Sequence, residues 1–166
     1  DLRQIISDPA LFQRVLSCYA TLLNGLSFDR IAGIPYGSLP TATGLSLQLH
    51  KPLVYPRKEV KAHGTRRMIE GEFNPGECIA VVDDILITGG SVLEGVGKLT
   101  ASELQVNDVV VFLDHGGRHD TRAKQRLADA GIALHAVLTL DQIADILKAA
   151  GRISADQADE LSSDPK

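Results

Sequence analysis

Apolar residues recur along the chain in short continuous runs that alternate with segments of helical spacing. The runs predict five strands, at residues 30–34, 53–55, 78–82, 108–114 and 132–138. Helical spacing predicts helices at residues 9–24, 39–49, 92–99, 121–130 and 140–150, the first of them preceded by Asp8 and followed by Gly25. Strands that are apolar along their whole length and alternate with helices indicate a parallel sheet covered on both faces. The pattern therefore predicts a doubly wound α/β domain of about five strands.

Length and composition favour one domain. The chain has 166 residues, of which 44% are apolar, so it can bury one sizeable core. We expect a domain at residues 1–152 and an acidic tail or linker at residues 153–166. The chain begins at Asp1 rather than Met, so further residues are expected in front of it.

Charge and hydropathy exclude two classes of partner. The formal net charge of −4 argues against a nucleic-acid footprint over the whole surface. Apolar runs are too short for a membrane span, and the first residues do not resemble a signal peptide. We expect a cytoplasmic protein that binds neither nucleic acid nor membrane.

Two adjacent acids end the third predicted strand, in the sequence IAVVDDILITGGS at residues 79–91. Burying Asp83 and Asp84 is costly unless something binds them. In open α/β sheets, ligands bind beyond the carboxyl ends of the strands. Carboxylates there can bind sugar hydroxyls or hold Mg²⁺ through water. The pair therefore indicates a polar ligand.

The small residues that follow the acids complete this pattern. Backbone N–H groups and hydroxyls from Thr88 to Ser91, placed at a helix N-terminus, can surround a phosphate. The alternative is an ordinary strand-to-helix turn in which Thr or Ser caps the helix. The preceding acids favour the phosphate, and together the two halves predict a site for a phosphorylated sugar.

The same residues carry a family resemblance. VVDDILITGGS resembles the phosphoribosyl pyrophosphate (PRPP) signature of type I phosphoribosyltransferases. RKEVKAHG, at residues 57–64, resembles the catalytic loop of orotate phosphoribosyltransferases, whose pattern is RKExKxHG. GIPYGSLPTAT and EGEFNPGE are also similar to segments of that family. The resemblance covers residues 1–150 and looks closest to the phosphoribosyltransferase half of bifunctional uridine monophosphate synthases.

The basic loop at residues 57–67 has chemistry that suits a pyrophosphate. It carries five Lys or Arg against one Glu, a net charge of +4. The alternative is a solvated charged loop. Cations delivered by a closing loop would stabilise the charge that develops on a leaving pyrophosphate, and Lys61 and His63 are suitable donors.

The resemblance implies a type I phosphoribosyltransferase fold, with the N-terminal hood of the family absent from this chain. It also implies a homodimer whose catalytic loop is shared across the interface, with Mg²⁺ held through PRPP and water near Asp83 and Asp84. Implied catalytic residues are Lys61, His63 and Asp84. Implied PRPP-binding residues are Tyr36, Arg57, Lys58, Lys61, His63, Asp83, Asp84, Ile85, Leu86, Ile87, Thr88, Gly89, Gly90 and Ser91.

The base-binding positions depart from the family pattern. Ile87 stands where the turn usually has a threonine, and His115 stands where an arginine usually pairs with the orotate carboxylate. Arg118 is a hypothetical substitute for that arginine. The resemblance implies transfer of a phosphoribosyl group from PRPP to orotate, giving orotidine 5′-monophosphate in pyrimidine synthesis. A phosphoribosyltransferase for a different base and a non-catalytic PRPP-binding regulator remain as alternatives.

Overall fold

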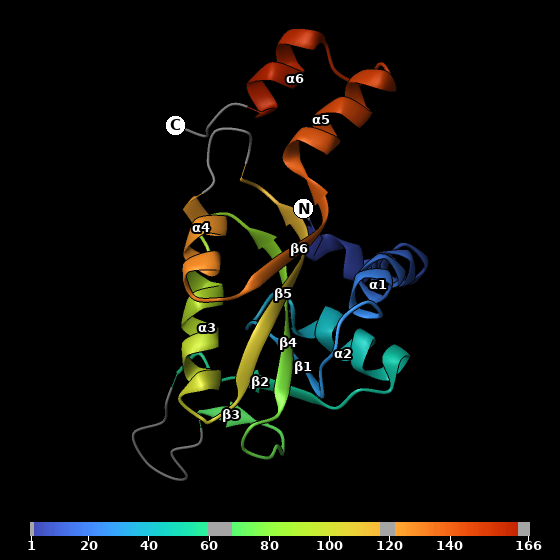
Figure 1. Cartoon of the computed structure of the whole chain (residues 1–166). Helices are drawn as coiled ribbons and strands as arrows, with labels where there is room; N and C mark the ends of the chain where they lie inside the picture. The colour runs from blue at the N-terminus through green and yellow to red at the C-terminus, as the bar shows by residue number, and fades with distance from the viewer. Residues whose placement is uncertain (1, 60–67, 117–121, 163–166) are drawn as a thin grey trace.

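The computed structural model describes residues 2–59, 68–116 and 122–162 (Figure 1). Within these ranges six strands form one sheet in the order β3-β2-β1-β4-β5-β6. Their bounds are Arg30–Gly33 (β1), Leu53–Pro56 (β2), Ile69–Glu70 (β3), Cys78–Leu86 (β4), Gln105–Asp114 (β5) and Ala133–Thr139 (β6). Neighbouring strands are parallel except for β2 and β3, which are antiparallel.

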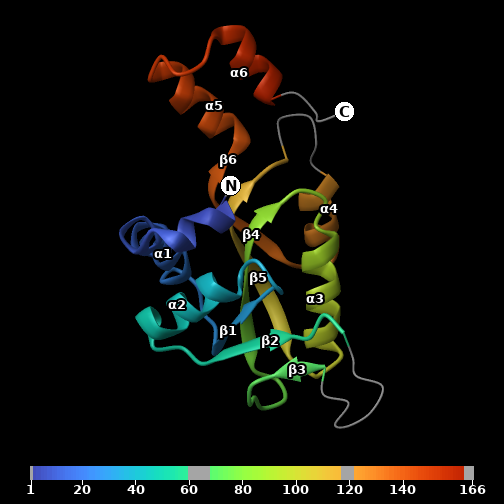
Figure 2. The same cartoon turned by 180° about the vertical axis from the view of Figure 1, so that it is seen from behind.

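Helices cover both faces of the sheet, as the sequence predicts (Figures 1 and 2). One face carries α1 (Pro9–Leu23) and α2 (Leu39–Leu49), and the other carries α3 (Gly90–Thr100) and α4 (Arg122–Asp129). A 3-10 helix, η1 (Leu2–Ser7), precedes α1. The pair α5 (Leu140–Ala149) and α6 (Ala155–Ser162) extends beyond the end of β6. In the part of the chain that the structure describes, no helix is long and apolar enough to cross a membrane.

The core consists of two apolar layers, one on each side of the sheet. Tyr19 and Leu45 pack from α1 and α2 against the face that presents Val82 and Val110. On the opposite face, the layer includes buried residues of α3, α4 and the alternate strand positions, among them Leu99, Leu127, Val81 and Val109. Strands buried on both faces account for the continuous apolar runs in the sequence.

Three elements differ from the sequence prediction. The sheet has six strands rather than about five, because the two residues of β3 are too few to show a period. Strand β4 continues through both aspartates to Leu86 instead of ending at residue 82.

The third difference is α6, which lies in the segment expected to be an acidic tail or linker. Ser154 and Gln157 cap this helix: the Gln157 N–H donates to Ser154 Oγ at 3.1 Å, and the Ser154 N–H donates to Gln157 Oε1 at 2.9 Å. Ala158 is buried. The segment is therefore helical, and the domain boundary at residue 152 stays a prediction.

The strand order reverses between β1 and β4. From β1 the chain crosses through α2 to β2 on one side, and from β4 it crosses through α3 to β5 on the other. The two crossovers leave a crevice at the carboxyl ends of β1 and β4, where open α/β sheets bind their ligands.

Candidate functional site

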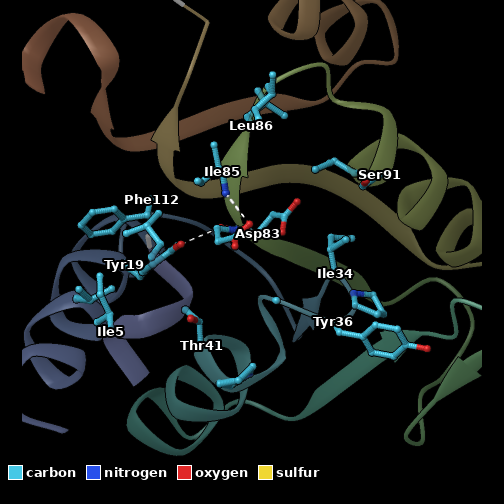
Figure 3. Close-up of a pocket in the computed structure, with 18 of the residues that line it drawn as sticks. Ile5, Tyr19, Ile34, Tyr36, Thr41, Asp83, Ile85, Leu86, Ser91 and Phe112 are labelled. Carbon is cyan, nitrogen blue, oxygen red and sulfur yellow. Dashed lines mark hydrogen bonds between the residues drawn. The ribbon is translucent and has the colours of Figure 1, made fainter. Parts of the chain in front are cut away.

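A cavity of about 650 Å³ occupies this crevice (Figure 3). Its lining comes from η1 and α1, the turn after β1 and the start of α2, the start of the basic loop, the end of β4 with its turn and the start of α3, and β5. The lining residues are Leu2, Ile5, Ile6, Phe12, Val15, Tyr19, Ile34, Pro35, Tyr36, Gly37, Pro40, Thr41, Lys58, Asp83, Asp84, Ile85, Leu86, Ile87, Thr88, Gly89, Gly90, Ser91, Val92 and Phe112. The cavity therefore brings together the acid pair, the turn after it, Tyr36 and Lys58.

Both aspartates line the cavity, and their backbone is held in place. The Asp84 N–H donates to Asp83 Oδ1 at 2.9 Å, and the Ile85 N–H donates to Asp84 Oδ1 at 2.8 Å. The Tyr19 hydroxyl donates to the Asp83 carbonyl at 2.7 Å (Figure 3). A Cβ on Gly37 would lie 3.1 Å from Asp84 Oδ2, so the absence of a side chain there keeps that oxygen accessible.

Burial changes the acidity of two of these groups. The pKa of Asp83 is raised to about 7, chiefly by desolvation and further by the neighbouring charge of Asp84. Desolvation also raises the pKa of the Tyr19 phenol, with the charges of Asp84 and Asp83 adding to the effect. Asp83 therefore keeps its proton to a higher pH than an ordinary aspartate, and a ligand that binds its carboxylate would favour release of that proton.

The raised pKa of Asp83 predicts a pH-dependent stability. Between the ordinary value of 3.8 and about 7, the folded chain keeps a proton that the unfolded chain has lost. The free energy of unfolding should therefore fall as pH rises through this window and level off above about pH 7. Asp83→Asn should flatten this slope in urea unfolding series, whereas Asp145→Asn on the exposed surface of α5 should leave it unchanged. An unchanged slope in Asp83→Asn would contradict the assignment.

The turn after β4 presents the open N-terminus of α3 to the cavity. Gly89 is the N-cap residue, with φ of +71°, and no side chain makes a cap hydrogen bond to the helix. The Gly90 N–H reaches Thr88 Oγ1 only at 3.5 Å. The capped-turn alternative is therefore not what the structure has, and the first N–H groups of α3 are available to an anion.

Helix α4 supports this turn from behind. The Arg126 guanidinium donates through Nη1 to the Thr88 carbonyl at 2.9 Å. A Cβ on Gly89 would lie 3.6 Å from the Cβ of Ala123. The turn is thus confined between the end of β4 and α4, which keeps its N–H groups directed at the cavity.

Two residues of the predicted PRPP site lie at the mouth of the cavity. Tyr36 is 65% exposed, and Lys58 Nζ lies 5.4 Å from its ring centroid, a cation–π distance. Arg57 does not line the cavity, since its guanidinium forms an ion pair with Glu70 of β3. Its predicted contact with pyrophosphate stays a prediction.

An apolar wall lies on the other side of the carboxylates from Ser91 (Figure 3). Ile5, Phe12 and Phe112 contribute to it, and the Tyr19 ring lies 5.9 Å from that of Phe112. Sequence reasoning missed this wall because its members come from three separate segments. Tyr19 offered one signal, since a tyrosine on the apolar face of a helix needs a partner for its hydroxyl.

The remaining predicted residues are placed differently. Ile87 lines the cavity and is half-exposed. His115 lies outside the lining, and its backbone N–H donates to the Leu86 carbonyl at 2.9 Å. Lys61, His63 and Arg118 lie outside the described residues. Their roles stay predictions.

The two carboxylates of the cavity suit a Mg²⁺ ion that is held partly through water and substrate oxygens. Among the described residues, no group of three or more His, Cys, Asp or Glu could hold a metal ion. Asp83 and Asp84 offer two carboxylates in one cavity, so Mg²⁺ would complete its oxygen shell with water and substrate oxygens, the arrangement it prefers. The residues present therefore fit the ion that the resemblance implies.

Comparisons with known proteins identify the family of the chain. No protein-family model matches the chain. The bifunctional enzyme PyrF/PyrE of Nostoc sp. is 56% identical over 95% of this chain and 32% of its own length. Orotate phosphoribosyltransferase of Pyrobaculum aerophilum is 40% identical over 89% of this chain and 75% of its own length. The structure of Leishmania donovani UMP synthase matches with a TM-score of 0.85 and 34% identity, over 97% of this chain and 34% of that one.

The length of the match differs between these relatives. The chain spans about a third of the Nostoc and Leishmania proteins and three quarters of the Pyrobaculum protein. The 40% identity to the Pyrobaculum protein, over three quarters of its length, establishes the family. The chain belongs to the orotate phosphoribosyltransferase family.

Proposed function

We propose that this chain transfers the phosphoribosyl group of PRPP to orotate, releasing pyrophosphate and forming orotidine 5′-monophosphate for pyrimidine synthesis. The observation that carries the proposal is that the acid pair and the open N-terminus of α3 face one cavity. The names of the relatives support it, since they include an orotate phosphoribosyltransferase and a UMP synthase.

Each part of the cavity has a role in this proposal. The turn from Thr88 to Ser91 binds the 5′-phosphate through backbone N–H groups, while Asp83 and Asp84 bind the ribose hydroxyls. Lys58, at the mouth beside Tyr36, faces the pyrophosphate side. In the reaction, the bond from ribose C1 to the pyrophosphate oxygen breaks, with its electrons leaving on pyrophosphate, and the bond from C1 to the base nitrogen forms as that nitrogen loses its proton. Positioning and charge stabilisation supply most of the rate.

Three further components belong to the proposal. Mg²⁺ neutralises the pyrophosphate oxygens when it is bound, near Asp83 and Asp84. The chain works as a homodimer in which the basic loop of one protomer, with Lys61 and His63, serves the site of its partner. It acts in the cytoplasm.

A different base is the second candidate. The observation that favours it is the wall beyond the carboxylates, which is built of hydrocarbon and aromatic side chains. Ile87, a further hydrocarbon side chain, also lines the cavity. Lys58 is the one described cation in the cavity lining. A base without a carboxylate would suit that wall, because a carboxylate gains most from a bidentate cation.

The test follows loss of orotate by ultraviolet absorbance with PRPP and Mg²⁺ present. Turnover that stops when Mg²⁺ is chelated is the expected result. A panel of uracil, adenine and hypoxanthine, which carry no carboxylate, provides the comparison under the same conditions. Turnover of one of these bases and not of orotate would replace the proposal with the second candidate. Binding of PRPP with no turnover of any base would support the regulator instead.

A further inference from the structure

Lys98 of α3 contacts the start of the basic loop without lining the cavity. Its Nζ donates to the Arg57 carbonyl at 2.9 Å, to the Lys58 carbonyl at 3.3 Å and to Glu94 Oε1 at 2.7 Å. The side chain is 18% exposed. All three donors of the ammonium are therefore engaged, two of them by consecutive carbonyls of another segment.

A close approach of α3 to the sheet makes these contacts possible. A Cβ on Gly95 would lie 2.4 Å from Cδ1 of Ile34 and 3.5 Å from Cγ of Pro56. A side chain at this position would have to displace the end of the Ile34 side chain, so glycine favours the close approach of the helix to the ends of β1 and β2. Lys98, almost one turn later, then reaches the residues that follow β2.

Through these contacts, helix α3 reaches two parts of the site: the phosphate-binding turn at its start and the basic loop near its end. Helix α3 begins at the phosphate-binding turn, and Lys98 lies about 12 Å further along its axis. The start of the basic loop also bonds to the residue before β3: the Arg57 N–H donates to the Met68 carbonyl at 2.8 Å. The backbone of Arg57 is thus held by α3 and by the β3 edge together.

Lys58 is the residue whose side chain depends on this support. Its carbonyl bonds to Lys98, and its ammonium lies over Tyr36 in the cavity mouth. Glu94 lies close to both lysines: a hydrogen bond from Lys98 lowers the pKa of Glu94 most, and the charge of Lys58 adds to the effect. A change at Lys98 would therefore alter both the backbone and the electrostatic surroundings of Lys58.

We propose that Lys98 is a positioning residue for PRPP binding: by holding the carbonyls of Arg57 and Lys58, it places the Lys58 ammonium where the pyrophosphate group binds. The inference rests on the proposed function. Lys98 itself does not touch the substrate.

The first experiment measures steady-state kinetics of Lys98→Met. Loss of the ammonium should raise the PRPP KM about tenfold, with a smaller change in kcat, because ground-state placement of one cation is lost. Lys98→Arg, which keeps the charge and several donors, should stay within about threefold of the parent chain. Lys148→Met, on the exposed surface of α5, is the matched control and should change neither constant. If Lys98→Met does not fold, Lys98→Gln carries the same expectation.

A double-mutant cycle with Lys58→Ala separates positioning from general stability. If Lys98 acts through Lys58, the effect of Lys98→Met on the PRPP KM should largely disappear in the Lys58→Ala background. Equal effects in both backgrounds, or an unchanged PRPP KM in Lys98→Met, would overturn the inference. Absence of turnover in the parent chain is a different result, because it rejects the proposed function itself.

Discussion

Replacing Lys61 with alanine should lower kcat by about 100- to 1,000-fold, the range observed when one preorganised donor to a developing charge is removed. The reason is electrostatic. Pyrophosphate gains negative charge as it leaves, and the basic loop concentrates a net charge of +4 in eleven residues. A cation that acts chiefly in the transition state affects turnover more than substrate affinity.

The measurement combines steady-state kinetics with calorimetric binding of PRPP. The Kd for PRPP should change much less than kcat in Lys61→Ala. Arg66→Ala removes a positive charge from the same loop, at a position outside the family pattern, and should have a much smaller effect. Equal losses in kcat and in PRPP affinity for Lys61→Ala would argue that the lysine only binds substrate.

Replacing Gly89 with valine should destabilise the chain by more than about 2 kcal/mol and raise the PRPP KM by at least about tenfold. Gly89 has φ of +71°, a conformation that β-branched residues resist. The valine methyl groups would also meet Ala123 and Leu86, whose nearest side-chain atoms would lie 3.6 and 3.7 Å from a Cβ at this position. The turn would have to adopt another backbone conformation, and the N–H groups at the start of α3 would no longer point at the cavity.

Gly97→Ala is the matched control in the same helix. Gly97 has ordinary helical geometry, and a Cβ there would meet nothing within 4 Å. The alanine should raise stability by about 0.5–1 kcal/mol, since glycine is a poor helix former. Urea unfolding and PRPP kinetics of both variants provide the check. Similar destabilisation by the two substitutions would argue that the loss in Gly89→Val does not come from the backbone conformation of the turn.

The sequence predicted those parts of the fold whose signal is local. The long strands are continuous apolar runs, and the helices beside them show clear periodicity, so both could be recognised. The strand β3 has only Ile69 and Glu70, which cannot show a period, and its pairing with β2 is a tertiary contact. The helix α6 is short and has three acids among its eight residues, and its cap at Ser154 is a local sign of a helix.

The residues of the candidate site also divide into those that a local motif identifies and those that only the fold brings together. Asp83, Asp84 and the turn at Thr88 are contiguous, so one motif identified them together. Tyr19 and Phe112 reach the cavity from distant segments, so no single motif contains both of them. The role of Lys98 could not be predicted from the sequence either. It depends on the close approach of α3 to the sheet at Gly95, which is seen only in the folded chain.

The hydrogen bond between Tyr19 and the Asp83 carbonyl also bears on how the site forms during folding. It joins residues 64 positions apart, so the acid pair reaches its final surroundings only after α1 has docked on the sheet. Helix α1 and its cap at Asp8 can form from local contacts alone, whereas pairing of β1 with β4 requires closure of a long loop. Organisation of the acid pair is therefore expected among the late events of folding, after the helices that surround it have formed.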